Sequence, residues 1–206
     1  MKRQTAVRHL VETAALATEG LRFRGSDVGW PLLELWVAGD LLTDARSIEN
    51  QAVVMVLDMP PEQLPWLARH PAGEWVGDHL RLPKRPMSWY YRPAARPVWN
   101  HQNRRLVRFW SADGGTDEDA VDGLRMPSRD PSGVVAPSTE ELATQLRTEL
   151  RVSERHLRET VDRYWDREWR RQHSGYDTSP DEHLWRAAAA VTEMQEALEH
   201  IADLAD

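Results

Sequence analysis

The arrangement of apolar and polar positions divides the chain into a first part with short strand-like runs and a last part with long helical stripes. In residues 4–19 the apolar side chains recur at helical spacing, and Gly20 follows as a helix-ending residue. The runs LLELWVA (32–38) and AVVMVLD (52–58) are short and apolar, as buried strands are. Two further strand-like runs lie at 87–91 and 106–112.

Shorter elements are expected between and after these strands. Helical pieces are predicted at 61–69 and 73–80, and a short helix is predicted after Thr116, which would cap a turn rich in acidic residues. Residues 127–137 are rich in Pro, Ser and Gly and are interpreted as a linker. Residues 1–126 are therefore predicted to form an α+β core with a mixed β-sheet.

Beyond the linker the pattern predicts two long helices. Ser138 with Glu141, and Ser179 with Glu182, have the spacing of capping boxes, and each pair precedes an apolar stripe at helical spacing. The stripes predict helices of roughly 30 and 25 residues. Because the connection between them is short, residues 138–206 are predicted to form an antiparallel helical hairpin.

Composition narrows the class of protein. The chain has 206 residues, a net charge of −7 and no cysteine, which excludes disulfides, thiolate catalysis and zinc–sulfur sites. The negative charge gives no strong signal for nucleic-acid binding. No apolar run approaches the ~20 residues that cross a bilayer, and no secretory signal is recognised at the N-terminus, so a cytoplasmic protein without membrane contact is expected.

Two residue usages are unusual. Of the 26 basic residues 24 are arginine, a bias typical of GC-rich genomes. The ten tryptophans predict a tryptophan-rich core, with exposed interface tryptophans as the alternative.

The stretch VAGDLLTDARSIENQAVVMVLD (37–58) reads as a strand, a glycine turn, a polar segment and a second strand. With the helix before it, this stretch resembles the nucleotidyltransferase core of antibiotic-modifying and minimal nucleotidyltransferases. The hairpin also resembles the helical C-terminal part of several such enzymes, and PVWNH (97–101) resembles a stretch found in an actinobacterial family. In nucleotidyltransferases the first strand ends in Gly-Ser, which holds a phosphate, and the next strand carries two carboxylates that hold Mg²⁺.

The resemblance carries over only in part. Gly39 matches the glycine, but Asp40 stands at the serine position, and Asn50 and Ala52 stand at the two carboxylate positions. The resemblance therefore implies a catalytically degenerate protein, for which no metal and no cofactor are expected. Two alternatives remain open: an unrelated α+β fold with an incidental glycine, or an active nucleotidyltransferase or other transferase with a non-standard site around Arg92–Arg105.

The segment 79–112 contains no acidic residue and mixes arginines with aromatic residues. Arginine beside aromatic rings suits phosphate capture and base stacking, whereas an arginine-rich face paired with acidic helices is the alternative. His101 is the best single candidate for a catalytic base, although a structural loop histidine would look the same. The candidate ligand-binding residues are Gly39, Arg92, Arg96, Trp99, Asn100, His101 and Arg105.

These observations predict a binding module more than an enzyme. The expected partner is a small anionic ligand or nucleotide at the glycine turn and the basic segment. The alternative is a regulatory module that binds a partner protein, or a second copy of the chain, through the hairpin of residues 138–206.

Overall fold

The computed structural model describes residues 1–27, 29–126, 133–175 and 179–203, and it shows an α+β protein, as predicted. The chain forms two compact units. Unit 1 contains Met1–Pro61 and His70–Pro137, and unit 2 contains Glu62–Arg69 and Ser138–Asp206. The chain therefore passes between the units three times, and the first two crossings flank the short segment Glu62–Arg69.

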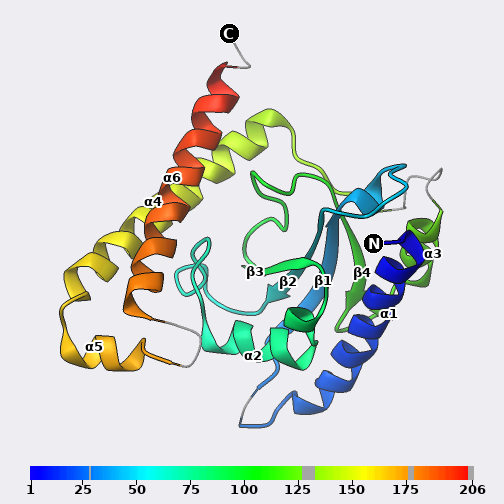
Figure 1. Ribbon diagram of the computed structural model, residues 1–206, viewed down its shortest axis with the longest axis horizontal. Helices are drawn as coiled ribbons and strands as arrows, with labels where there is room; N and C mark the ends of the chain where they lie inside the picture. Colours follow the sequence, from blue (N-terminus) through cyan, green and yellow to red (C-terminus); the bar gives the residue numbers. More distant parts are fainter. Residues whose placement is uncertain (28, 127–132, 176–178, 204–206) are drawn as a thin grey trace. The chain divides into compact units, whose positions relative to one another are not determined.

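Unit 1 contains a five-stranded mixed sheet in the order β3-β2-β1-β4-β5 (Figure 1). Strand β1 runs antiparallel to β2 and β4, and β2 runs parallel to β3. The four longer strands match the predicted runs, whereas the two-residue β5 was not predicted. The bounds are β1 (Leu32–Gly39), β2 (Gln51–Leu57), β3 (Ser88–Pro93), β4 (Leu106–Ser111) and β5 (Gly115–Thr116).

Two helices cover one face of this sheet. Trp110 of β4 donates its indole N–H to Thr18 of α1 (Arg3–Gly20), and Gly77 of α2 (Pro71–His79) lies so close to the Trp89 ring of β3 that a Cβ there would come within 2.8 Å of it. The ladder places Trp89 and Trp110 on the same face of the sheet. Two aromatic residues of the segment 79–112, Trp89 and Trp110, therefore pack against the helices that cover this face of the sheet.

The remaining short helices of unit 1 flank this layer. Helix α3 (Glu118–Arg125) begins after Asp117, whose carboxylate accepts the Ala120 N–H, so the cap lies one residue after the predicted Thr116. Three 3₁₀ helices complete the unit: η1 (Leu21–Phe23), η2 (Asp40–Leu42) and η3 (Leu82–Lys84).

The other face of the sheet, called the outer face below, carries a smaller apolar cluster. Ala38, Ala52, Val54 and Leu106 are buried there, and Trp36, Tyr90, Val98, Trp99 and Val135 pack against them. Val98 and Trp99 belong to the loop 94–105 between β3 and β4. This loop therefore covers part of the outer face.

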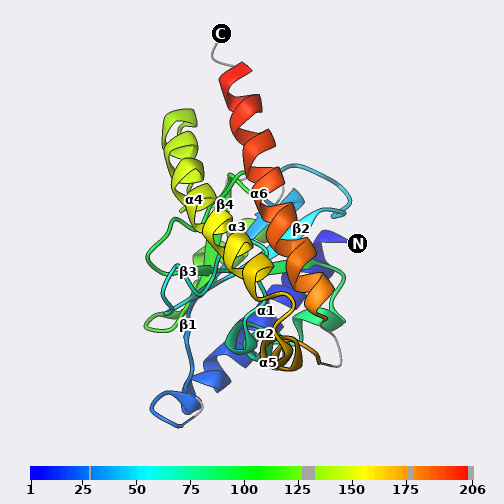
Figure 2. The ribbon, with the colours of Figure 1, turned by 90° about the vertical axis from the view of Figure 1, so that its left-hand side faces the viewer.

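Unit 2 is built on the predicted hairpin. Helices α4 (Thr139–Arg163) and α6 (Pro180–Asp203) run antiparallel and side by side (Figure 2). Ser138 accepts the Glu141 N–H, and the Glu141 carboxylate accepts the Ser138 N–H, so the first capping box is confirmed. At the second, Ser179 accepts the Glu182 N–H.

The first long helix is shorter than predicted. It ends at Arg163, and a separate helix α5 (Arg167–Gln172) follows. The cause is Asp166, whose carboxylate accepts the Trp169 N–H at 2.7 Å and so starts a new helix.

The predicted helix at 61–69 is wrong, because this segment consists of turns. Leu67 has φ +59°, a conformation that cannot continue a right-handed helix. The segment instead lies along α6: the Trp66 indole donates to Glu193 at 3.0 Å, and the Arg69 guanidinium lies 3.8 Å from the Glu182 carboxylate. Leu64 and Trp66 are buried.

The ten tryptophans divide between core and surface. Trp30, Trp66, Trp110 and Trp169 are buried, whereas Trp165 and Trp185 of unit 2 are 83% and 66% exposed. The other four are half-buried. Among the described residues, no helix is both long enough and apolar enough to cross a membrane.

Candidate functional site

Gly39 occupies a position that only glycine fits. It ends β1 with φ +101°, and a Cβ atom there would lie 2.1 Å from the carbonyl oxygen of Asn50. The same oxygen accepts the Asp40 N–H at 2.8 Å. The glycine is thus required by the close approach of two backbone segments, the end of β1 and the start of β2.

The Asp40 carboxylate closes the loop between these strands. Its Oδ2 accepts the backbone N–H groups of Glu49 and Asn50, both at 2.8 Å. The N–H of Asn50 contributes most, followed by that of Glu49, to holding the pKa of Asp40 below its ordinary value. Asp40 is therefore an ionised structural cap, and its charge stands beside the glycine turn.

Arg3 of α1 fixes the same loop from the other side. Its guanidinium donates, among the described residues, only to backbone carbonyl groups, at distances of 2.6–3.4 Å. The five acceptors are the carbonyls of Asp40, Leu41, Thr43, Ala45 and Leu124. The loop is thus held by a cation and an anion that both act on the backbone.

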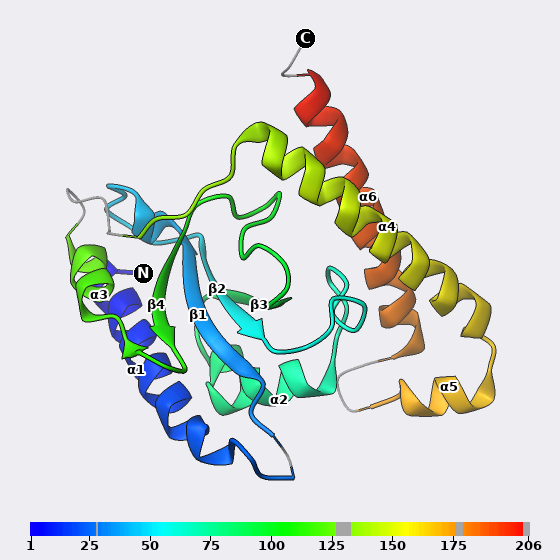
Figure 3. The same cartoon turned by 180° about the vertical axis from the view of Figure 1, so that it is seen from behind.

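Strand β1 ends and the antiparallel β2 begins at one end of the sheet (Figure 3). A cavity of about 360 Å³ lies at this end, where the parallel β3 also begins. This volume lies at the small end of the range found for ligand sites. Strand alternation places Ala52 and Ser88, which are level with each other, on the outer face. The lining residues are Gly39, Glu49, Asn50, Gln51, Ala52, Pro86, Met87, Ser88 and Asn103.

The lining offers hydrogen-bonding groups and a negative charge. The side-chain amides of Asn50 and Asn103 make no hydrogen bond within the described residues, and Glu49 contributes a carboxylate without an ion pair in that part of the chain. The Ser88 hydroxyl is already used, because it donates to the Gln51 carbonyl at 3.0 Å. No arginine or lysine is among the lining residues that the structure describes.

Asn100, one of the predicted site residues, builds the turn that presents Asn103. Its buried Oδ1 accepts the backbone N–H groups of Gln102 and Asn103, at 3.0 and 2.7 Å. Its own N–H donates to the Asn103 carbonyl at 3.0 Å. Asn100 thus acts on the cavity through Asn103.

Arg92 and Trp99 have structural positions. The Arg92 guanidinium is buried and donates to the carbonyl of Pro97 at 2.9 and 3.1 Å and, at 3.4 Å, to that of Trp99. Trp99 packs against the apolar cluster of the outer face. Both residues fold the loop 94–105, and neither lines the cavity.

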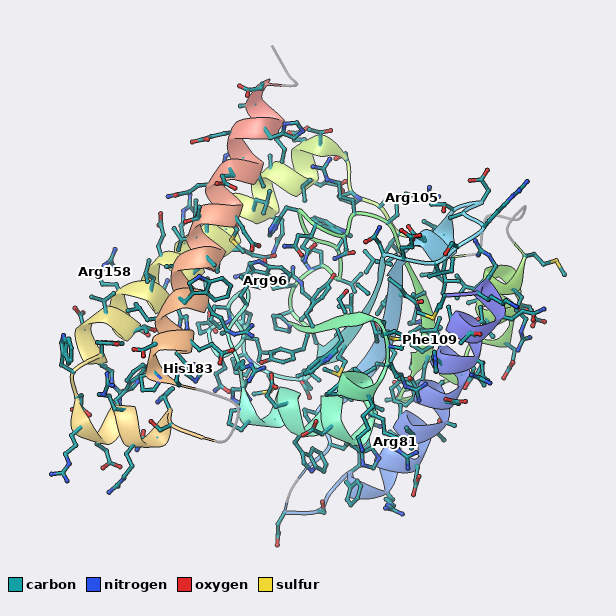
Figure 4. All side chains as sticks on the ribbon, in the orientation of Figure 1. Arg81, Arg96, Arg105, Phe109, Arg158 and His183 are labelled. Carbon is teal, nitrogen blue, oxygen red and sulfur yellow. The ribbon has the colours of Figure 1, made fainter. Side chains whose placement is uncertain are left out.

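The remaining basic candidates do not converge. Arg92 pairs with Val56, near the end of β2. Arg105 directly precedes Leu106, which pairs with Ala38 of β1, and Ala38 in turn pairs with Ala52 at the start of β2. Four residues of strand separate these levels, or ~13 Å. Arg96 and Arg105 lie well apart in Figure 4, and Arg81 lies at a third place. His101 is half-buried and is not a lining residue.

The residues at the glycine turn do not fit a Mg²⁺ ion of the kind that the resemblance implies. Ala52 has no donor atom, and one Asp40 oxygen already accepts two backbone N–H groups. Within the described residues, no group of three or more His, Asp or Glu side chains is arranged to hold a metal ion.

Comparison with known proteins places the chain in one family. A family model matches residues 1–200, which includes parts of both units. The chain belongs to the family described as Domain of unknown function (DUF7711). No curated protein and no solved structure matches the chain.

The sequence pattern identified part of this cavity and missed the rest. Gly39, Asn50 and Ala52, the positions compared in the resemblance, lie together in the lining, whereas Met87, Ser88 and Asn103 were not singled out. One feature of the sequence could have indicated Asn103. It lies in WNHQN (99–103), three residues after Asn100, and an asparagine side chain at this spacing can accept the backbone N–H of Asn103 in a turn.

Proposed function

We propose that this protein is a binding protein and that the cavity at Gly39 is its small-molecule site. The observation that carries the proposal is the cavity at the end of the sheet, whose lining combines polar and apolar residues. Its backbone is fixed by Asp40 and Arg3, while Asn50 and Asn103 keep side-chain amides available. Preorganised polar groups around a concave surface are typical of ligand sites.

The same geometry gives no support to phosphoryl transfer. Of the arginines expected to grip a phosphate, Arg92 binds backbone carbonyls, and none is among the described lining residues, whereas the acidic residue Glu49 is. A phosphate prefers backbone N–H groups and cations. The two N–H groups beside the glycine turn are occupied by Asp40.

The test is a ligand-observed and protein-observed NMR screen of the full chain with a fragment library. We expect fragments that perturb the backbone amides of Gly39, Asn50, Ser88 and Asn103 together, and a loss of this response in Met87→Trp, whose larger side chain fills the cavity. Gln195→Trp, an exposed position of α6, is the control. A library without any such fragment would contradict the proposal.

A second candidate function, partner binding through unit 2, is favoured by one observation. Val161, Trp165 and Trp185 are large apolar side chains that are mostly exposed on the hairpin and its turn. The version with a second copy predicts a dimer in sedimentation velocity that becomes a monomer in the double variant Trp165→Ser, Trp185→Ser. A monomer at all concentrations would exclude that version.

A further inference from the structure

The charges around the cavity determine which ligands it accepts. Glu49 lines the cavity, and the Asp40 carboxylate, whose pKa the backbone N–H groups of Asn50 and Glu49 hold below its ordinary value, stands beside the same turn. Arg3, the cation that fixes the same loop, is directed at five backbone carbonyls. An anionic ligand would meet a negative field with no lining cation to offset it.

The hydrogen-bonding groups favour an uncharged partner. A side-chain amide both donates and accepts, and two residues with such amides, Asn50 and Asn103, line the cavity. An uncharged group with a donor beside an acceptor, such as a carboxamide or a cyclic imide, can pair with both functions of an asparagine amide. A carboxylate or a phosphate can only accept, so it would leave the asparagine carbonyl oxygens unpaired.

The shape of the lining suits a small flat molecule. Gly39 contributes no side chain, and Ala52, Pro86 and Met87 supply apolar contact surface beside the amides. A volume of about 360 Å³ accommodates a single substituted ring with some of its solvent.

We infer that the cavity selects uncharged small molecules with a carboxamide-type or imide-type edge and rejects their carboxylate and phosphate counterparts. The inference rests on the proposed small-molecule site and specifies its ligand class. Asn50 and Asn103 bind the edge of the ligand, and Glu49 supplies the charge that excludes anions.

The experiment uses pairs of ligands that share a ring and differ in charge. Nicotinamide is compared with nicotinate, and uracil with orotate, by titration of the full chain at low salt with the amides of Gly39, Asn50, Ser88 and Asn103 as reporters. A single unit charge near Glu49 is worth about a fivefold change in Kd in partly aqueous surroundings. We expect the uncharged member of each pair to bind about fivefold more tightly, and the difference to shrink with added salt.

Two variants separate the roles of charge and hydrogen bonding. Glu49→Gln keeps the backbone N–H that bonds Asp40 and removes the lining charge, so the preference for the uncharged member should shrink in this variant. Asn103→Asp removes two donors and should weaken nicotinamide binding. Gln195→Glu adds the same charge in unit 2, at an exposed position, and should change neither Kd.

The outcomes distinguish this inference from the proposed function. If the anionic member binds as tightly or more tightly at these amides, the ligand class is wrong and the site stands. If the fragments that bind are other than nicotinamide, nicotinate, uracil and orotate, their charges are compared instead. A majority of anionic fragments among those that bind would overturn the inference. If nothing perturbs these amides, the site and the ligand class both fail.

Discussion

At the scale of single residues, Gly39 and Asp40 both serve the backbone of the turn that joins β1 to β2. Gly39 lets the chain pass within van der Waals distance of Asn50, and Asp40 satisfies the N–H groups of Glu49 and Asn50. In the resemblance to nucleotidyltransferases, Asp40 stands at the position of the serine that holds a phosphate. Because its oxygen faces backbone donors, its charge stabilises the turn.

Replacement of Gly39 by alanine tests this account. The added Cβ would overlap the Asn50 carbonyl, and φ +101° is strained for any L side chain, so we expect the free energy of unfolding to fall by at least about 2 kcal/mol. Gly25→Ala is the matched control, because its φ is also positive but a Cβ there meets nothing within 4 Å. Urea denaturation measures both variants, and equal losses would show that only the strain of φ matters.

Gln51 gives a second prediction at this scale. Its side chain is buried, and neither amide atom has a hydrogen-bonding partner within the described residues. Gln51→Met removes the unpaired groups with little change in shape and should raise the free energy of unfolding by ~0.5–1 kcal/mol. A loss of stability in the same denaturation experiment would instead show that the amide binds an internal water molecule.

At the scale of elements, local signals were readable from the sequence and long-range ones were not. The hairpin helices were predicted because Ser138 and Glu141 lie three residues apart and bond each other directly. The cavity combines Asn50, Ser88 and Asn103, which come together only through the pairing of β2 with β3 and the fold of the loop 94–105. Nothing in the spacing of arginines showed that Arg92 would bond the carbonyls of that loop.

The turn of the hairpin gives a pH-dependent prediction. Burial, helped by the nearby His173, lowers the pKa of His183 to about 4, and the two imidazole rings lie 4.7 Å apart. A histidine has a pKa of about 6.5 in the unfolded chain. The unfolded state therefore takes up the proton first, so the stability that neutral His183 contributes above pH 6.5 is lost as the pH falls toward 4.

Thermal denaturation followed by circular dichroism from pH 7.5 to 4.5 measures this loss. His183→Gln should flatten the fall in Tm over that range, because the variant cannot bind the proton. His200→Gln, at an exposed histidine of the same helix, should leave the fall unchanged. Parallel curves for the wild type and His183→Gln would contradict the assignment.

At the scale of the whole molecule, the two units differ in charge. Unit 1 contains 16 basic and 16 acidic residues, whereas unit 2 contains 10 basic and 17 acidic residues. Unit 2 thus carries the entire net charge of −7. The two acidic residues at the cavity of unit 1, Glu49 and Asp40, are therefore a local feature of a unit with no net charge.

The stability of unit 2 should depend on the segment Glu62–Arg69, which lies outside the hairpin in sequence but belongs to the same compact unit. Trp66→Ala removes a buried side chain and its hydrogen bond to Glu193, so we expect a loss of about 3 kcal/mol or more. Trp165→Ala changes a side chain that is 83% exposed and should stay within about 0.5 kcal/mol. Similar losses at both positions would contradict the assignment of this segment to unit 2.

The interleaving of the two units along the chain governs how the protein can be cut. A peptide of residues 138–206 would lack the Leu64 and Trp66 side chains that belong to its own compact unit. The complementary fragment 1–137 would carry both of them without the helices they accompany, leaving an apolar segment open to aggregation. Mixing the two fragments should restore solubility by complementation, so functional dissection requires point variants or paired fragments and not a single truncation.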